Sequence, residues 1–355
     1  MAICIDDLPA ARPLDKGAPV PDPSTAPAIR WGILGAGGIA RMFARAVQHH
    51  TVSQIAAVGS RSEEKARSFA HDFHVPRAYA SYEDLVASRD VDAIYVASPH
   101  SHHRDHALLA LEAGKPVLVE KAFARNATEG LEIFERALRS DLFAMEAMWT
   151  RFLPATALVH EIINSGQIGE IVSIIADHGQ RLDFDPYGRL LNPALAGGAL
   201  LDLGVYTVAY AHDFLGAPAS MQATGKLTDT GVDGQAALLL DYPGKAVAAL
   251  HTTLWAKTAT TAVIAGSEAW IEVPGDFYCP ASVRLHLPDG LTKEISPGFP
   301  AGHAGLAFEA AEVARCIDAG QIQSARNPWR DTIEVLTVLD RARAALGVVY
   351  PGEGD

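Results

Sequence analysis

Residues 29–47 read IRWGILGAGGIARMFARAV, and the fold can be worked out from this stretch. The apolar run 29–34 predicts a short buried strand. Apolar residues between 39 and 47 recur every three or four positions, which predicts an amphipathic helix. The turn between them, Gly35-Ala-Gly37-Gly-Ile-Ala40, fits the pattern G-x-G-x-x-G/A. In that setting Gly35 permits the tight turn, Gly37 lets the backbone approach a pyrophosphate, and Ala40 allows close packing of helix on strand. The stretch therefore predicts a dinucleotide-binding turn.

The alternation of strand and helix continues to about residue 150. Further buried strands are predicted at 52–58, 91–97 and 117–119, with helices after Ser62, through 107–111 and over 126–139. Ser62 is a typical N-cap, and acids follow it in the first turn, where the helix dipole favours them. This alternation predicts an α/β Rossmann domain with a parallel sheet, helices on both faces and sites at the carboxyl ends of its strands.

After residue 150 the pattern changes to an α+β domain. A helix is predicted at 154–164, and two more at 304–319 and 329–346. Between them lie β-rich runs, which predict a large, open, mostly antiparallel sheet: 170–177, 219–228, 235–242, 246–255, 259–265 and 269–273. The predicted divisions are a Pro-rich arm at 1–28, the dinucleotide-binding domain at 29–150, and a substrate-binding and oligomerisation domain at 151–355. The arm is expected to be mobile because its six prolines leave no periodic apolar pattern.

Composition narrows the class of protein. The 355 residues are 49% hydrophobic and 20% charged, which is typical of a soluble globular chain. The net charge of −13 argues against nucleic-acid and anionic-membrane partners. Three scattered cysteines give no disulfide framework and fit a reducing compartment. No apolar run approaches the length of a membrane span, and the first residues lack the positive charge of an export signal, so we expect a cytoplasmic protein.

The end of the second predicted strand bears on the choice of cofactor. NAD-binding proteins usually place an acid there for the ribose hydroxyls, whereas this chain reads Gly59-Ser60-Arg61, with Lys65 one turn further on. A guanidinium suits a 2′-phosphate, since it offers a charged, bidentate donor. The pattern favours NADP over NAD. The alternative is that both cations are ordinary solvated surface residues.

Two groups of residues could carry chemistry. Lys121 follows Glu120 at the end of a predicted parallel strand, where an amine could polarise a hydroxyl or transfer a proton, or be a plain surface residue. Asp202 and Tyr206 are four residues apart and would share one helix face as an acid/base and orienting pair. The four histidines at 100, 102, 103 and 106 lack a nearby cysteine or acid pair, so we predict no metal site. No hydrolase or kinase motif is present.

These motifs together resemble the Gfo/Idh/MocA oxidoreductases, and the resemblance runs from about residue 29 to the C-terminus. More narrowly, three blocks resemble the dimeric dihydrodiol dehydrogenases, a branch grouped with NADP-linked D-xylose dehydrogenases. The motifs that carry the resemblance are the glycine turn, Ala97-Ser-Pro-His-Ser-His-His103, Ala113-Gly-Lys-Pro-Val-Leu-Val-Glu-Lys121, Met145-Glu-Ala-Met-Trp-Thr-Arg-Phe-Leu-Pro154, residues 196–206, and Thr230-Gly-Val-Asp-Gly234 with Tyr242-Pro-Gly244.

The resemblance implies hydride transfer between a nicotinamide and a carbinol carbon, and a dimer contact through the open C-terminal sheet. It implies that Lys121, Tyr206 and Asp202 are the catalytic residues, and that Trp149 and Phe152 line the substrate pocket with Asp202 and Tyr206. The residues expected to bind the cofactor are Gly35, Gly37, Gly38, Ile39, Ser60, Arg61, Lys65, Ser98, His100, His103, Glu120 and Lys121.

The chain departs from the family at Ala122, which replaces the proline that usually follows the lysine. The family usually has a cis-type turn at this proline, and the sequence leaves open whether this chain has that turn. The Pro-rich arm also lies outside the family pattern. In the oxidative direction we expect Tyr206, its pKa lowered by Lys121, to accept the substrate proton. The alternative gives the proton to Lys121 directly.

Two other function classes stay open, a glycosidase that uses a tightly held nicotinamide and a non-catalytic ligand sensor. The substrate also stays open, among sugars, polyols and trans-dihydrodiols.

Overall fold

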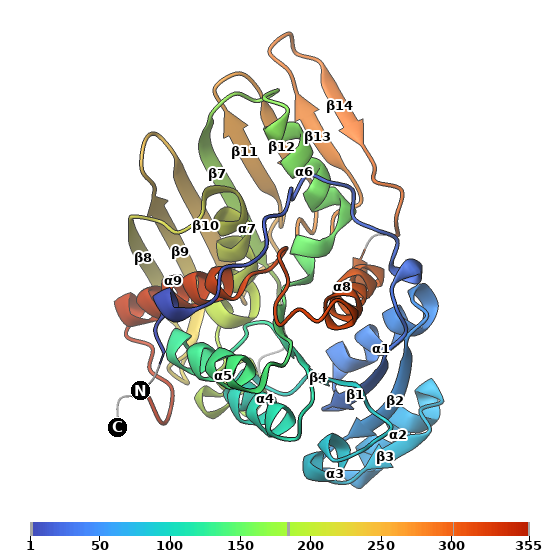
Figure 1. Ribbon diagram of the computed structural model, residues 1–355. Helices are drawn as coiled ribbons and strands as arrows, with labels where there is room; N and C mark the ends of the chain where they lie inside the picture. Colours follow the sequence, from blue (N-terminus) through green and yellow to red (C-terminus); the bar gives the residue numbers. More distant parts are fainter. Residues whose placement is uncertain (1–2, 183–184, 301, 354–355) are drawn as a thin grey trace. The chain divides into compact units, whose positions relative to one another are not determined.

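The computed structural model describes residues 3–182, 185–300 and 302–353 (Figure 1). The chain divides into two compact units. Unit 1 comprises Met1–Leu14, Pro21–Phe152 and His303–Ile333, and unit 2 comprises Asp15–Val20, Leu153–Gly302 and Glu334–Asp355. This division differs from the predicted one because residues 303–333 belong to unit 1 and the N-terminal segment is shared between both units.

Unit 1 is built on a six-stranded sheet in which every strand pair is parallel, with the order β3-β2-β1-β4-β5-β6. Its strands are β1 (Arg30–Leu34), β2 (Gln54–Gly59), β3 (Arg77–Tyr79), β4 (Ala93–Val96), β5 (Val117–Glu120) and β6 (Ala144–Ala147). Every residue of β4, β5 and β6 is buried, as expected for strands covered on both faces. The predicted Rossmann sheet is confirmed, and its strand order reverses between β1 and β4, where such sheets bind ligands.

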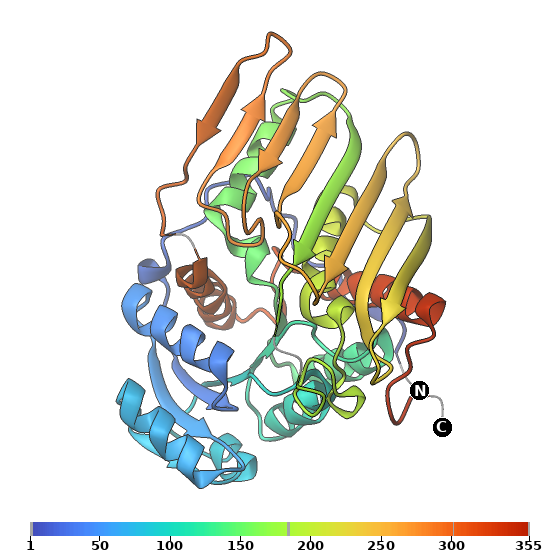
Figure 2. The ribbon, with the colours of Figure 1, turned by 180° about the vertical axis from the view of Figure 1, so that it is seen from behind.

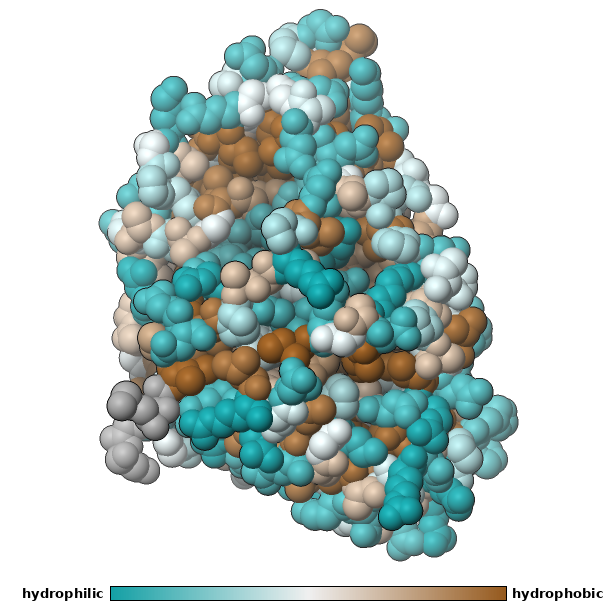
Figure 3. Space-filling view, viewed as in Figure 1, coloured by the Kyte–Doolittle hydropathy of each residue, from teal (hydrophilic) through white to brown (hydrophobic). Residues whose placement is uncertain are grey.

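The helices of unit 1 are amphipathic. They are α1 (Gly38–His50), α2 (Glu63–Phe73), α3 (Tyr82–Val86), α4 (His103–Glu112), α5 (Ala127–Ser140) and α8 (Leu306–Asp318), with short 3₁₀ turns η1 (Ile5–Asp7), η2 (Pro23–Thr25), η3 (His100–His102) and η4 (Trp149–Phe152). The hydroxyl of Ser62 accepts a hydrogen bond from the backbone N–H of Lys65, so the predicted cap of α2 is confirmed. The surface over α2 and α3 is mostly hydrophilic in Figure 3.

Unit 2 is built on an eight-stranded sheet of order β14-β13-β12-β11-β7-β10-β9-β8. Its strands are β7 (Ile171–Gly179), β8 (Ser220–Leu227), β9 (Asp233–Asp241), β10 (Val247–Thr253), β11 (Ala262–Gly266), β12 (Trp270–Val273), β13 (Val283–His286) and β14 (Thr292–Ile295). Strands β7 and β10 are parallel and the other described pairs are antiparallel, which confirms the prediction.

Helices cover one face of this second sheet. They include α6 (Pro154–Asn164) and α7 (Val205–Leu215), while α9 (Trp329–Leu346) has its first residues in unit 1 and the rest in unit 2. Seen from behind in Figure 2, the opposite face of the sheet carries no helix. Burial alternates along the strands accordingly, so that Ile174 is buried and Ile175 is 55% exposed.

One helical stretch in the described part of the chain, Pro193–Leu215, is long and apolar enough to cross a membrane by length and composition. This corrects the expectation that no apolar run approaches that length. Because 89% of its most apolar window is buried inside the structure, the stretch has the character of a core helix.

The N-terminal segment is packed against the rest of the chain, which differs from the mobile arm predicted from its prolines. Leu8 and Ala26 are buried, and the backbone carbonyls of Pro9 and Asp22 accept hydrogen bonds from Gln323 and Arg315 within unit 1. Prolines lack the backbone N–H that helices and sheets need, but the carbonyl oxygens of such a segment still accept hydrogen bonds from side chains elsewhere.

Candidate active site

The glycine turn of unit 1 has the geometry that a bound pyrophosphate needs. Gly35 has a φ of 105°, and a Cβ there would lie 2.8 Å from the carbonyl oxygen of Ala97, so only glycine fits. Gly37 caps α1, and a Cβ at Gly37 or Gly38 would meet nothing within 4 Å. The turn therefore leaves open space in front of the N-terminal amides of α1, where a phosphate binds favourably.

The end of β2 carries exposed positive charge and no acid. Ser60 is buried, whereas Arg61 and Lys65 are exposed. Within the described part of the chain neither cation makes an ion pair, in contrast to Arg67, which pairs with Glu63 on the same helix. Two cations without a protein counter-ion beside a pyrophosphate turn are suited to a 2′-phosphate.

The histidines that follow β4 contact backbone carbonyls, the hydroxyl of Ser98 and one another. The two ring nitrogens of His103 lie 2.9 Å from the carbonyl oxygen of Ala122 and 2.8 Å from that of Ser98. Burial lowers the pKa of His103 to about 4, so near neutral pH its single N–H donates to one of these carbonyls. His106 contacts the hydroxyl of Ser98 at 2.9 Å, and burial lowers its pKa to about 4 as well. These rings fix the loops at the ends of β4 and β5.

Glu120 ends β5 and Lys121 follows it directly. The Glu120 carboxylate is buried, and it accepts hydrogen bonds from the hydroxyl of Tyr95 and, at 3.3 Å, from the backbone N–H of Lys121. The carbonyl of Lys121 lies 3.3 Å from the Nε2 of His100. The Lys121–Ala122 peptide bond is cis, with Ala122 in place of the usual proline.

Behind this strand end lie two buried acids that sequence reasoning did not single out. Glu146 accepts hydrogen bonds from the backbone N–H of Phe123 and the hydroxyl of Thr332, both at 3.1 Å, and burial raises its pKa to about 7. Burial raises the pKa of Glu309 well above its ordinary value, and neither of its carboxyl oxygens has a hydrogen-bond partner among the described residues. Nothing in the pattern of a buried strand or helix marks such an acid in advance.

The predicted pocket residues Trp149 and Phe152 lie in η4 and are almost fully buried, with exposed fractions of 3% and 1%. The ring of Trp149 stacks on the imidazole of His303, with ring centroids 5.5 Å apart. Within unit 1 these two side chains therefore pack in the core, and their contact with a substrate stays a prediction.

In unit 2, Asp202 and Tyr206 lie on adjoining helical segments, as their spacing predicts. Asp202 belongs to the π-helical turn η6 (Leu200–Gly204), and Tyr206 to the first turn of α7. Both side chains are largely buried. Arg189, which was not predicted, donates a 2.8 Å hydrogen bond to the Asp202 carboxylate. A half-exposed guanidinium thus pairs with this acid.

The phenol of Tyr206 packs in an aromatic cluster that sequence reasoning also missed. Its ring centroid lies 5.4 Å from that of His178 and 5.0 Å from that of Tyr278. His178 faces the carbonyl oxygen of Leu203 through Nδ1 and the amide nitrogen of Gln180 through Nε2. The Nε2 atom must accept from that amide, so Nδ1 carries the proton and donates to Leu203. The only feature of the sequence that could have marked His178 as a site residue is its place near the end of a predicted strand.

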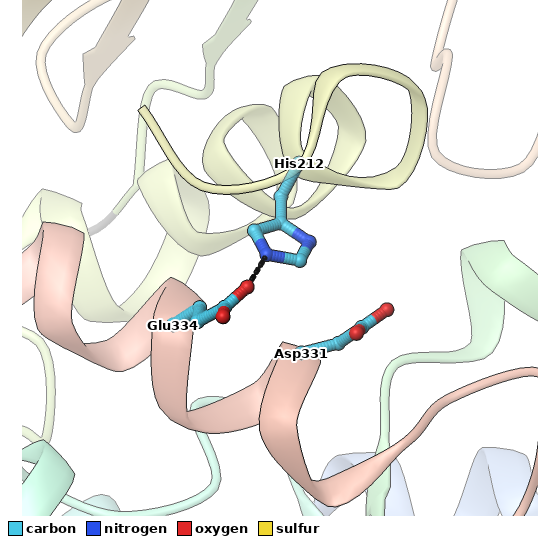
Figure 4. Close-up of side chains that lie close together, drawn as sticks. All are labelled: His212, Asp331 and Glu334. Atoms are coloured by element: carbon cyan, nitrogen blue, oxygen red, sulfur yellow. Dashed lines mark hydrogen bonds and ion pairs between the residues drawn. The ribbon is translucent and has the colours of Figure 1, made fainter. Parts of the chain in front are cut away.

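Figure 4 shows a second group of polar side chains. The Nε2 of His212 on α7 lies 2.7 Å from a carboxyl oxygen of Glu334 on α9 within unit 2, and Asp331 lies one turn earlier on the same helix. Asp331 accepts a 2.7 Å hydrogen bond from the buried Arg151 within unit 1. Both acids thus have protein partners, and the group gives no independent sign of a bound ion.

The structure therefore assembles two sets of predicted residues, each within its own unit. Unit 1 holds the glycine turn, the Arg61 region and the Glu120–Lys121 strand end with its histidines. Unit 2 holds Asp202 and Tyr206 together on one helical segment.

Comparison with known proteins identifies the family. Residues 29–147 match the model of the Gfo/Idh/MocA oxidoreductase family with its NAD-binding Rossmann fold, and residues 156–272 match a C-terminal domain of the same family. The chain is 36% identical to a trans-1,2-dihydrobenzene-1,2-diol dehydrogenase from Danio rerio, over 91% of this chain and 98% of that protein. The chain belongs to the Gfo/Idh/MocA oxidoreductase family.

Two further relatives extend the comparison. An NADP-linked D-xylose 1-dehydrogenase from Hypocrea jecorina is 35% identical, over 91% of this chain and 93% of that protein. Among solved structures, a variant of a 3-ketoreductase from Actinomadura kijaniata, in complex with TDP-benzene and NADP, is 26% identical with a TM-score of 0.77. That similarity covers 90% of this chain and 98% of the ketoreductase.

Proposed function

We propose that this chain is an NADP-dependent dehydrogenase that transfers a hydride between the nicotinamide and a carbinol carbon of a sugar, polyol or trans-dihydrodiol. The observation that carries the proposal is the similarity, over nearly the full length, to a trans-dihydrodiol dehydrogenase and an NADP-linked D-xylose dehydrogenase. Both of these relatives are named as dehydrogenases, so their names support this class of reaction for the chain. Their substrates differ, so the names do not select one substrate.

The residues at the nucleotide end of unit 1 fit NADP. The open space at Gly37 and Gly38 would admit the pyrophosphate, and Arg61 with Lys65 would hold the 2′-phosphate. The turn formed by Ser98, His100 and His103 would border the nicotinamide end. When bound, NADP accepts the hydride that leaves the carbinol carbon.

For the proton we assign the acceptor to Tyr206, with Lys121 as the cation beside the reacting hydroxyl and Asp202 as the residue that orients the substrate. As the carbinol C–H bond breaks, the O–H proton passes to the phenolate oxygen and a C=O bond forms, so the charge is balanced. The alternative is direct transfer of the proton to the amine of Lys121. Either route matches general acid/base catalysis by a positioned side chain.

Two substitutions test the assignment. Lys121→Met and Tyr206→Phe should each lower kcat by about 100-fold or more while NADPH binding, followed by fluorescence, stays within about twofold. Lys293→Met, an exposed lysine on β14, is the matched control and should keep wild-type turnover. Full turnover by Lys121→Met would contradict the assignment of that lysine.

A substrate screen separates the possible classes of function. Aldoses, inositols and trans-dihydrodiols are each incubated with NADP and with NAD, and the absorbance of the reduced cofactor is followed. Net reduction of free NADP supports the dehydrogenase. Sugar cleavage without net reduction would indicate a glycosidase with a tightly held nicotinamide, and no reaction across the whole panel would indicate a ligand sensor.

We also propose that the chain forms a homodimer through the helix-free face of the sheet in unit 2. A row of apolar side chains crosses that face on neighbouring strands, since Ile175 pairs with Ala249 and Val263, and Ala249 pairs with Leu239. Ile175 and Leu239 are about half exposed, and a contiguous exposed apolar row of this kind is typical of an interface. A second copy of the same face would cover it symmetrically.

A cytoplasmic location completes the proposal. Cys4, Cys279 and Cys316 are all unpaired, which fits a reducing compartment. Fractionation of cells that express the protein would test this location.

A further inference from the structure

The helical segment that carries Asp202 and Tyr206 is preceded by a turn with little freedom. Gly198 has a φ of 122°, and a Cβ at this position would come within 2.2 Å of the Oδ1 atom of Asp233. The backbone N–H of Gly198 donates to the carbonyl of Leu190 at 2.9 Å. Glycine is required here both for the backbone conformation and for the close approach of the Asp233 carboxyl group.

Asp233 lies at the start of β9 and is fully buried. Its Oδ2 atom accepts a 2.6 Å hydrogen bond from the backbone N–H of Leu200, the first residue of η6, and its carboxylate is also bonded to the backbone of Ala199. The first N–H groups of a helical segment have no partner within the helix, so an acid at this end satisfies them and complements the helix dipole.

A second contact fixes the same turn from the C-terminal end of the chain. The buried hydroxyl of Tyr350 donates a 2.6 Å hydrogen bond to the carbonyl oxygen of Gly197. Burial raises the pKa of Asp233 to about 7, and the positive charge of Arg343, whose guanidinium lies 4.5 Å from the centre of the Tyr350 ring, acts in the opposite direction. Residues from β9, α9 and the C-terminal segment therefore converge behind one turn of backbone, and all of them belong to unit 2.

We propose that Asp233 is a positioning residue for the reaction, because its carboxylate fixes the start of the helical segment and thereby the direction in which Asp202 and Tyr206 point. The inference rests on the proposed function, which gives those two residues their roles. Asp233 itself lies behind the segment, and its effect is transmitted through the backbone of Ala199 and Leu200.

The test compares Asp233→Ala with Asp233→Asn. The alanine variant should lower kcat by about 10- to 100-fold, since small displacements of catalytic groups have effects of this size, while the KM for NADP stays within about twofold. The asparagine variant keeps an acceptor for the Leu200 N–H and should retain kcat within about fivefold. Both are measured well below the melting temperature, and rates are expressed per folded molecule from near-UV circular dichroism.

Two further variants make the comparison decisive. Asp92→Ala is the matched control, because Asp92 also accepts a backbone N–H, from Arg30 in unit 1, and its loss should leave kcat unchanged per folded molecule. Tyr350→Phe removes the hydroxyl that holds Gly197 and should lower kcat by about 3- to 10-fold with an unchanged KM for NADP. If Asp233→Ala does not fold, Tyr350→Phe still tests whether loosening this turn lowers kcat.

The positioning role of Asp233 would be overturned if Asp233→Ala and Tyr350→Phe both kept wild-type kcat while Tyr206→Phe was inactive. The proposed function would then still stand. A fall in activity that only follows the folded fraction would overturn the positioning role in the same way. Full activity of Tyr206→Phe would instead overturn the proposed function, and the inference with it.

Discussion

Arg61 is the residue on which the choice of cofactor depends. It is exposed at the end of β2 without an ion pair among the described residues, and the acid typical of NAD-binding proteins is absent there. We expect Arg61→Ala to raise the KM for NADP by about 10- to 100-fold, the effect of losing charge-assisted hydrogen bonds to a phosphate. The KM for NAD should change by less than about threefold. Steady-state kinetics with both cofactors measure the two effects.

The matched control for this prediction is Arg67→Ala. Arg67 lies on the same helix but pairs with Glu63, so its removal should leave both KM values unchanged. An unchanged KM for NADP in Arg61→Ala would show that the cation is an ordinary surface residue.

Glu146 makes a second prediction at the residue scale, which concerns pH. Burial raises its folded-state pKa from 4.5 to about 7. Between these two values the folded protein holds a proton that the unfolded chain has released, so the stability from the neutral acid is lost as the pH rises through this window. The loss is at most about 1.4 kcal/mol per pH unit.

Replacing Glu146 with glutamine removes this titration. The melting temperature of Glu146→Gln relative to wild type should therefore increase from pH 5 to about pH 7 and then level off. Thermal unfolding at four pH values measures the trend. Glu64→Gln, on the exposed face of α2, controls for the loss of a surface carboxylate. A constant difference between Glu146→Gln and wild type would contradict the raised pKa.

At the scale of elements, sequence patterns predict those segments whose local signals agree with their tertiary surroundings. The strand at 29–34, the cap at Ser62 and the helix at 154–164 carry strong periodicity or a capping side chain, and the structure confirms them. Strands β3, β6, β13 and β14 were not predicted, because each is only three or four residues long and contains a charged residue, whereas the equally short β4 lies in a continuous apolar run. They form because a neighbouring strand supplies their hydrogen bonds.

The mobile arm expected at the N-terminus was wrong for a different reason, because side-chain contacts with distant residues hold this segment in place. One of these contacts gives a third prediction. The amine of Lys16 lies 2.7 Å from the carboxylate of Asp213, which is buried and also bonded to His160, all within unit 2. Because a hydrogen bond to a charged group contributes about 1.5–3 kcal/mol, Lys16→Met should lower the free energy of unfolding by an amount in this range. Urea denaturation measures the change.

Lys245→Met is the control for Lys16→Met. Lys245 pairs with Glu170 on the surface at 3.7 Å, and both side chains are largely exposed, so its loss should cost less than about 0.5 kcal/mol. Equal effects of the two substitutions would mean that the contact between Lys16 and Asp213 stabilises unit 2 no more than a surface ion pair does.

At the scale of the whole molecule, the candidate site was only partly predictable. Lys121, Asp202 and Tyr206 stand in recognisable motifs, so they could be found without coordinates. Arg189, His178 and Asp233 could not, because their importance depends on contacts between residues from 25 to 33 positions apart, or on a loop with no pattern of its own. The net charge of −13 is a property of the whole chain. It therefore does not predict the local positive charge at Arg61 and Lys65.

The helix-free sheet face gives the last prediction, which concerns the number of chains in the molecule. Ile175 is 55% exposed and Leu239 is 47% exposed on neighbouring parts of this face. The wild-type protein should have twice the 37.7 kDa mass of one chain by light scattering at micromolar concentration. Introducing a charge with Ile175→Glu or Leu239→Glu should give single chains, because an unpaired carboxylate would have to be buried in the interface.

Val52→Glu is the control for these two variants. It alters an equally exposed apolar residue of unit 1 and should leave the mass unchanged. A wild-type mass equal to one chain would contradict the dimer, and an unchanged mass in both sheet variants would place the contact elsewhere.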